Sequence, residues 1–321
     1  MLAAAIAAGC AGCSSGSGQI LMPYTNAKED IDPAAMIPAD RADGFSSDLA
    51  VVSVDQAASA DTKKKLSDID ATEIFLTGTD DGKVLAASEI YKTMPPASLT
   101  KILTALIALK SGTDLDKEYT LGDDISVSVA DAQVCGFKAG DVITLRTLLY
   151  CMLIYSGNDA ANAVASVVSG GDIPSFCKKM NQEASRLGAT QTNFVTPNGL
   201  DEADHYSSAY DLYLIFRECL GYDLFRDAIS QKGYTAHFKR DGKEITQYYA
   251  STNHYKTGEA QPPKGVTVVG GKTGTTDKAG LCLILYAQDD SGKGYISVLL
   301  GSPDKSTLYE SMTNLLSNIG K

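Results

Sequence analysis

Runs of residues that favour β-strands lie at both ends of the sequence beyond about residue 71, and helical patterns lie between them. The first runs, in "TEIFLTGTDDGKVLAAS", flank Asp81-Gly82 and predict a β-hairpin. Three more, "GVTVVGGKTG", "GLCLILYAQ" and "GYISVLLGS", come near the end and are separated by turns. Because these runs enclose the helices, we expect a fold of the α/β class, of α+β type, in which distant segments close one sheet and the helices form an insertion on one side.

Apolar residues at helical spacing fill the region between the strands. The stretch "PPASLTKILTALIAL" predicts a helix from about Ser98 to Lys110, directly after a proline start signal. A capping box, Ser208 with Asp211 three residues later, predicts the start of another helix. The other predicted helices are two that meet at "YSGN" within 145–170, one over 172–189 and one over 305–320.

The charge balance disfavours one class of partner. The chain has 28 Lys and Arg against 39 Asp and Glu and a net charge of −11, whereas nucleic-acid binding needs concentrated positive charge. We therefore expect no nucleic acid as partner. The three histidines show no metal-ligand spacing, so no metal site is expected. Four of the later cysteines have apolar neighbours and are expected to be buried free thiols: Cys151, Cys177, Cys219 and Cys282.

Residues 1–20 have the composition of a signal remnant followed by a Ser/Gly linker. "AAGC", ending at Cys10, is similar to the lipobox of bacterial lipoproteins, whose cysteine carries the lipid, and "CAGC", ending at Cys13, matches it less well. We expect export to the extracytoplasmic surface, with membrane contact only through a lipid at Cys10; a cleaved signal or a cytosolic segment are the alternatives. Residues 21–70 predict an acidic flexible leader, and 71–321 the main domain.

A serine and a lysine begin the first apolar helix. Three residues of helix turn through about 300°, so Ser98 and Lys101 share a face, and the next residues on that face are small. Burial lowers the pKa of a lysine until it can accept a proton, and a serine beside such a base is a candidate nucleophile. The alternative is an ordinary helix-start serine with a surface lysine. The same S-x-x-K spacing recurs at Ser175–Lys178 and at Ser302–Lys305, but neither copy opens a long apolar helix.

Two further motifs follow in order. "YSGNDAANA" supplies Ser156 and Asn158, and "VVGGKTGTTDKAG" supplies Lys272-Thr273-Gly274 on a predicted strand. A second K-T-G, at 256–258, and a second S-x-N, at 251–253, lie in loop-like sequence. We therefore choose the motifs at Ser156 and Lys272.

The stretches "PPASLTKILTAL", "SGNDAANAVA", "TNFVTPNGLDEADHYSSAYDL" and "GGKTGTTDKAG" resemble the D-alanyl-D-alanine carboxypeptidases among the low-molecular-mass penicillin-binding proteins. The resemblance covers about residues 71–320. It implies a β-lactamase/transpeptidase-like fold: an antiparallel sheet covered by helices, plus an all-helical subdomain, with the cleft between them. It also implies a peptidoglycan stem peptide ending in D-Ala-D-Ala as substrate, β-lactams as covalent inhibitors, and no cofactor.

The resemblance assigns roles residue by residue. Ser98 would be the nucleophile, Lys101 its base, and Ser156 a proton relay to the leaving amine. Asn158 would hold the substrate amide or the lysine, and Lys272 would lower the pKa of Lys101 further. The backbone N–H groups of Ser98 and Thr275 would form the oxyanion hole, and His205 would support a loop near the cleft. The implied substrate-binding residues are Thr273, Gly274, Thr275 and Thr276.

Some features depart from the family pattern and keep alternatives open. Relatives commonly carry an arginine after the last strand for the substrate carboxylate, but the last arginine here is Arg240, which leaves Lys305 as a substitute. A class A β-lactamase would need a glutamate in E-x-x-x-N between Asn158 and Lys272, and no such pair occurs. A D,D-endopeptidase would use the same residues. A non-catalytic peptidoglycan-binding lipoprotein would be expected to show a broken motif.

Overall fold

The computed structural model describes residues 66–320. The predicted lipid-bearing Cys10, the signal remnant 1–20 and the leader up to residue 65 lie outside the described residues. Within the described part of the chain, no helix is both long enough and apolar enough to cross a membrane.

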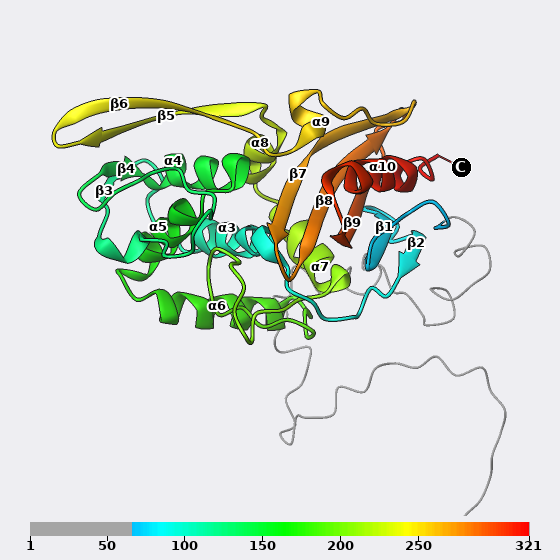
Figure 1. The fold of residues 1–321 in the computed structure, drawn as a ribbon, viewed down its shortest axis with the longest axis horizontal. Helices are drawn as coiled ribbons and strands as arrows, with labels where there is room; N and C mark the ends of the chain where they lie inside the picture. Colours follow the sequence, from blue (N-terminus) through cyan, green and yellow to red (C-terminus); the bar gives the residue numbers. More distant parts are fainter. Residues whose placement is uncertain (1–65, 321) are drawn as a thin grey trace, which may run out of the picture. The chain divides into compact units, whose positions relative to one another are not determined.

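A five-stranded antiparallel sheet joins the two ends of the domain, with strand order β2-β1-β9-β8-β7 (Figure 1). The strands are β1 (Glu73–Gly78), β2 (Val84–Ser88), β7 (Val266–Thr276), β8 (Gly280–Asp289) and β9 (Gly294–Ser302). Ile74 of β1 pairs with Ser88 on one side and with Leu299 on the other. The predicted hairpin and the predicted closure of one sheet by distant segments are therefore confirmed.

Helices cover both faces of this sheet, because its strands alternate apolar residues between the faces. On one face Leu76 and Leu285 pack in one buried cluster with residues of α10 (Lys305–Leu316). On the other face Phe75 and Val298 belong to the cluster of α3 (Thr100–Lys110) and α7 (Ala209–Cys219). Ser208 caps α7 by accepting from Asp211 N at 3.2 Å, while the Asp211 carboxylate accepts from Gln191 N instead of returning to Ser208. Of the two reciprocal bonds of a capping box, the bond from Asp211 N to the Ser208 hydroxyl is thus confirmed.

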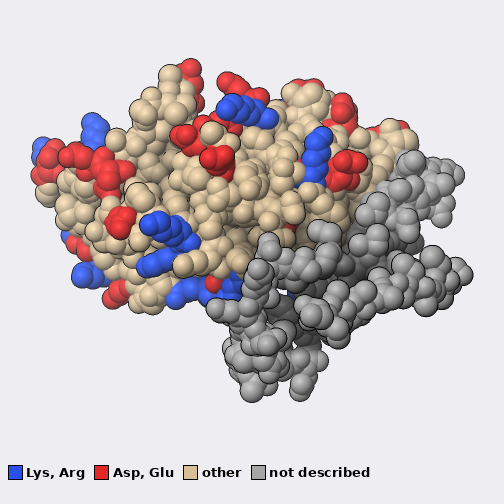
Figure 2. Space-filling model, turned by 90° about the horizontal axis from the view of Figure 1, so that it is seen from below, with Lys and Arg blue, Asp and Glu red and all other residues tan. Residues whose placement is uncertain are grey.

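The part of the chain between β2 and β7 is mainly helical. Its other helices are α4 (Leu145–Tyr150), α5 (Asn158–Ser169), α6 (Ile173–Arg186), α8 (Asp223–Ser230) and α9 (His254–Thr257), with a π-helical turn at Cys151–Tyr155 and 3₁₀ turns at Ala97–Leu99 and Asp123–Ile125. Figure 2 shows basic and acidic side chains interspersed on the face that it presents. Ion pairs join helices of this region, and Lys110 of α3 lies 2.8 Å from Glu183 of α6.

The expectation of an all-helical subdomain is wrong. A second antiparallel sheet, of order β3-β4-β5-β6, lies beside α4 and the π-helical turn Cys151–Tyr155 (Figure 1). Its strands are β3 (Glu118–Thr120), β4 (Val142–Thr144), β5 (Gly233–Arg240) and β6 (Lys243–Ala250). The first two have three residues each, too few to display an alternating pattern, and β6 is mostly exposed, so it lacks the apolar alternation of a half-buried strand.

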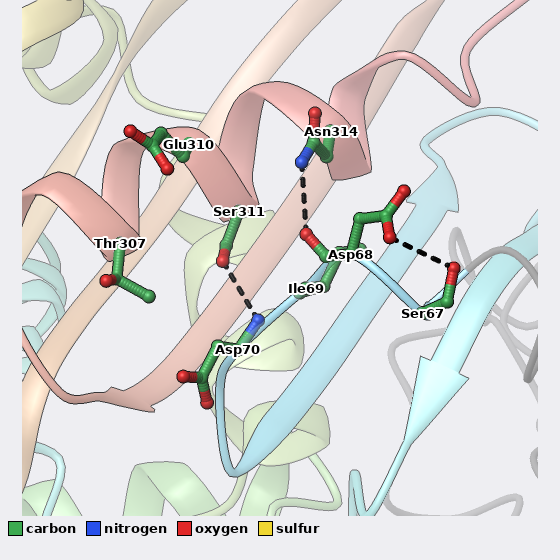
Figure 3. Close-up of a pocket in the computed structure, with 8 residues that line it drawn as sticks. All are labelled: Ser67, Asp68, Ile69, Asp70, Thr307, Glu310, Ser311 and Asn314. Atoms are coloured by element: carbon green, nitrogen blue, oxygen red, sulfur yellow. Dashed lines mark hydrogen bonds between the residues drawn. The ribbon is translucent and has the colours of Figure 1, made fainter.

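Residues 66–70, which belong to the predicted leader, lie against α10 (Figure 3). Asp70 N donates to Ser311 Oγ at 2.9 Å, and Asn314 Nδ2 donates to Asp68 O at 3.0 Å. These contacts place the start of the chain's described part on the same helix that covers the sheet. The four cysteines expected to be buried are buried and free, and Cys135 is free and partly buried.

Candidate active site

Ser98 lies in the short 3₁₀ turn Ala97–Leu99, and α3 begins at Thr100, two residues later than predicted. Ala97 has φ +49°, in the left-handed region that residues with a side chain rarely adopt. The turn is packed against β7, because a Cβ added to Gly274 would lie 3.2 Å from Ser98 N and 3.1 Å from Ala97 Cβ. The strained turn therefore presents the half-buried Ser98 beside the edge strand that carries the K-T-G sequence.

Lys101 is fully buried and its amine has three neighbours. Nζ lies 2.7 Å from Ser98 Oγ, 2.8 Å from Asn158 Oδ1 and 2.5 Å from Asn198 O. The two carbonyl oxygens can only accept, so in the neutral form of the amine they can take its two N–H bonds and leave its lone pair for the Ser98 hydroxyl. Burial, followed by the positive charge of Lys272, lowers the pKa of Lys101 well below its usual value. Geometry and electrostatics both favour Lys101 as a base for Ser98.

A second buried lysine faces a second serine. Lys272 Nζ lies 2.7 Å from Ser156 Oγ and 2.8 Å from Thr273 O, and burial lowers its pKa to about 7. Ser156 has φ +69° at the end of the π-helical turn, and α5 begins two residues later at Asn158. The backbone therefore reverses at Ser156 so that Ser156 meets Lys272 while Asn158 meets Lys101. The structure thus brings together all five residues predicted as catalytic.

The predicted substrate-binding residues lie on β7, the edge strand of the first sheet. Gly274 is required by the close approach to Ser98 described above, and Thr275 is exposed beside it. Thr273 Oγ1 lies 2.5 Å from Thr252 Oγ1. Thr276 Oγ1 donates to Asp201 Oδ1 at 2.7 Å, so this hydroxyl is already bound to a carboxylate.

Other copies of the motifs form no such arrangement in the described residues. Lys178 is exposed on α6, and Ser302 donates to Asp70 O. Lys256, of the second K-T-G, donates to Val269 O at 2.9 Å. The last arginine, Arg240, pairs with Asp141 at 2.7 Å. Lys305, the predicted substitute for a carboxylate-binding arginine, lines a surface hollow together with His254, Glu259 and Tyr309.

Three residues support the site from outside its motifs: Asn198 and Gly199, which were not singled out from the sequence, and His205, which was. The backbone oxygen of Asn198 accepts a hydrogen bond from Lys101. The next residue, Gly199, has φ +83°, and a Cβ at this position would lie only 2.0 Å from Ala97 O, so a side chain does not fit there. His205 is buried; its Nε2 lies 2.8 Å from Thr100 Oγ1 and its Nδ1 accepts from Val195 N at 3.1 Å. Burial lowers the pKa of His205 to about 4, so it is neutral and holds the 195–199 segment on the start of α3. The predicted supporting role of His205 is confirmed.

The described residues include no group of three or more His, Cys, Asp or Glu side chains that could hold a metal ion. The chemistry of the site rests on serine hydroxyls, lysine amines and amides.

Comparisons with known proteins agree with this geometry. A sequence profile of the family described as D-alanyl-D-alanine carboxypeptidase matches residues 56–304. The D-alanyl-D-alanine carboxypeptidase DacF of Bacillus subtilis is 31% identical over 252 residues, which are 77% of this chain and 61% of that protein. The D-alanyl-D-alanine carboxypeptidase DacB2 of Mycobacterium tuberculosis is 36% identical over 202 residues, which are 62% of this chain and 64% of that protein. The chain therefore spans about three fifths of the length of these curated relatives.

Solved structures show the same fold. The Streptomyces K15 DD-transpeptidase superposes with a TM-score of 0.72 at 28% identity, covering 78% of this chain and 97% of that one. The D-alanyl-D-alanine carboxypeptidase from Mycobacterium tuberculosis H37Rv superposes with a TM-score of 0.67 at 30% identity, covering 78% and 90%.

Proposed function

This chain belongs to the D-alanyl-D-alanine carboxypeptidase family, and we propose that it removes the terminal D-alanine from peptidoglycan stem peptides through an acyl-enzyme on Ser98. The observation that carries the proposal is the position of the Lys101 amine, 2.7 Å from Ser98 Oγ with its other two neighbours both carbonyl oxygens. This arrangement supplies a neutral, oriented base to the serine without a histidine.

Acylation begins when Ser98 Oγ attacks the carbonyl carbon between the two D-alanines and Lys101 Nζ takes the hydroxyl proton. The N–H groups of Ser98 and Thr275 are the proposed donors to the oxyanion, and the close approach of Gly274 to Ser98 N supports this pairing. When the C–N bond breaks, the leaving amine receives the hydroxyl proton of Ser156. Lys272, which donates to Ser156 Oγ, then supplies Ser156 with a new proton. D-alanine leaves, and the proton that Lys101 gained passes to Lys272, so both amines return to their starting states. The neutral Lys101 then takes a proton from the water that attacks the ester carbonyl, and it gives that proton to Ser98 Oγ as the ester C–O bond breaks.

The edge of β7 is the proposed binding place of the substrate backbone and carboxylate. Lys272 supplies a buried cation there, and Thr273 and Thr275 supply hydroxyls. Thr276 is the weaker candidate of the set, because its hydroxyl is bound to Asp201. The same residues would serve β-lactams, whose strained amide would acylate Ser98.

Intact mass after mixing with benzylpenicillin, followed over time, tests the reaction. A persistent adduct that maps to Ser98, absent in Ser98→Ala, is expected together with release of D-alanine from a pentapeptide. Rapid turnover to penicilloate would identify a β-lactamase instead, and release of monomers from cross-linked dimers would identify a D,D-endopeptidase. If neither an adduct nor turnover is observed, the remaining interpretation is a non-catalytic peptidoglycan-binding protein.

We also propose that the chain acts outside the cytoplasmic membrane, tethered by a lipid on Cys10. The support is the sequence "AAGC" ahead of the Ser/Gly-rich segment, together with a substrate that lies outside that membrane. Metabolic labelling with a fatty-acid probe, compared between wild type and Cys10→Ser, should show label on the wild type alone. Label on neither protein would refute the anchor.

A further inference from the structure

Asp159, the residue after Asn158, is a buried carboxylate whose recorded partners in the described chain are backbone N–H groups. The residue is 4% exposed. Oδ1 accepts from Cys135 N at 2.8 Å and Ala160 N at 2.9 Å, and Oδ2 accepts from Gly136 N at 2.8 Å and Phe137 N at 3.0 Å. Three consecutive amides converge on one carboxylate because Gly136 adopts φ +81°.

The segment 133–137 (the 133–137 loop) also holds Asn158. Gln133 O accepts from Asn158 N at 2.8 Å and from Asn158 Nδ2 at 3.0 Å. With Nδ2 held in this way, the amide of Asn158 must direct Oδ1 toward Lys101, which donates to it at 2.8 Å. The orientation of a residue that touches the base therefore depends on a loop fastened by Asp159.

Resting on the proposed function, we propose that Asp159 is a positioning residue for acylation: it fastens the 133–137 loop so that Gln133 fixes Asn158 against Lys101. The role is distinct from that of a mere helix-start acid, because three of its four bonds go to the loop and only one to its own helix. Its charge also acts on the base. The charged or titratable groups around Lys101 are Lys272, Cys135, Asp159 and His205, and the negative Asp159 raises the pKa of Lys101 against burial and Lys272.

Asp159→Asn tests the role, because the new amide N–H₂ would face backbone N–H groups and release the loop. We expect the acylation rate constant for a fluorescent penicillin to fall by about tenfold or more. The acidic limb of its pH profile, where Lys101 becomes protonated, should move to lower pH, because removing the charge lowers the pKa of Lys101. Asp211→Asn is the matched control: Asp211 is equally buried and accepts from Gln191 N at 2.7 Å, so its loss should lower stability but leave acylation within about twofold.

A double-mutant cycle with Asn158→Ala separates positioning from general damage. If Asp159 acts through Asn158, Asp159→Asn should lower the acylation rate constant far less in the Asn158→Ala background than in the wild type. The inference would be overturned if Asp159→Asn had the same acylation rate constant and pH profile as the wild type. It would also be overturned if the losses of the two substitutions were fully additive in the cycle. Wild-type chain that is not acylated at all would refute the proposed function instead.

Gly136→Ala provides a second variant if Asp159→Asn does not fold. It strains the loop at φ +81° with no neighbour within 4 Å of the new Cβ, and it leaves the charge in place. Acylation should fall by about tenfold while the acidic limb stays where it is in the wild type. An unchanged rate in this variant would count against a positioning loop.

Discussion

At the scale of single residues, the site depends on two lysines that the fold keeps buried. An amine in water is charged at neutral pH, and burial shifts that equilibrium toward the neutral form. Lys101 is surrounded by Ser98 and two carbonyl oxygens, whereas Lys272 contacts Ser156 and one carbonyl. The difference supports the proposed role of Lys101 as the base and the proposed role of Lys272 as a cation or proton donor.

Lys101→Ala should lower the acylation rate constant by about 10²–10⁴-fold, the usual contribution of a positioned base, while the thermal transition remains cooperative. Fluorescent-penicillin labelling and circular dichroism measure the two effects. Lys256→Ala is the control, because that amine is partly buried and donates to Val269 O outside the site. Equal losses of acylation in the two variants would argue against the assignment of Lys101.

Lys272→Met should be stabilising relative to wild type, and increasingly so as the pH falls from about 10 to about 7. The pKa of Lys272 is about 7 in the folded chain and near 10.5 when unfolded, so between these values the unfolded state binds the extra proton. The free energy of unfolding of the wild type therefore falls as the pH falls through this window. The variant does not show this decrease, because methionine does not titrate. Thermal melts of both proteins between pH 6 and 10 should show a difference that grows and then levels off below pH 7; a pH-independent difference would contradict it.

At the scale of elements, strand β7 and the turn that carries Ser98 must fit closely. Gly274 is the contact point, and the turn is already strained at Ala97. The sequence predicted this pairing of elements only through the resemblance of its motifs. Apolar periodicity identified the first sheet and its covering helices, but it could not identify β6, whose residues are mostly exposed.

Gly274→Ala should lower acylation by about tenfold or more, because its methyl group would crowd Ala97 and shift Ser98 N from the edge of β7. Gly221→Ala introduces a methyl at a comparable 3.2 Å from Glu218 O, after α7, and serves as the control. Penicillin labelling of the three proteins at matched concentration gives the comparison. Undiminished labelling of the Gly274 variant would mean that the Ala97–Leu99 turn can move away from the added methyl group without lowering the acylation of Ser98.

The supporting residues of the site lay beyond sequence reasoning for a physical reason. Motifs identify side chains, and the predicted serines, lysines and Asn158 do come together. Asn198 and Gln133, however, act through backbone oxygens, which every residue possesses. Only the folded path of the chain shows which carbonyl reaches Lys101 or Asn158.

At the scale of the described domain, the first sheet forms the most buried framework and the second sheet a more exposed one. Strand β9 is buried at almost every position, whereas β6 is exposed at most. Stability within a domain follows such differences in burial and packing.

Backbone hydrogen exchange followed by mass spectrometry should therefore be slowest in β8 and β9 and faster in the β5–β6 hairpin. Covalent acylation should slow exchange near Ser98 and the 133–137 loop without reversing this order. Protection of the hairpin equal to that of β9 would show that the two sheets open as one unit.

The pairing of β1 with β9 has a consequence for the order in which the enzyme is made. Glu73 pairs with Leu300, so the sheet that carries the proposed active-site edge is complete only after β9, the last strand of the described residues, has been made. Ser98 and Lys101 emerge early in synthesis, but Lys272 follows only after the whole helical region. During synthesis the proposed nucleophile and its proposed base are thus present long before the second lysine and the strand proposed to bind the substrate. The sheet that carries the proposed active-site edge is therefore incomplete in a nascent chain until β9 has been made and has paired with β1 and β8.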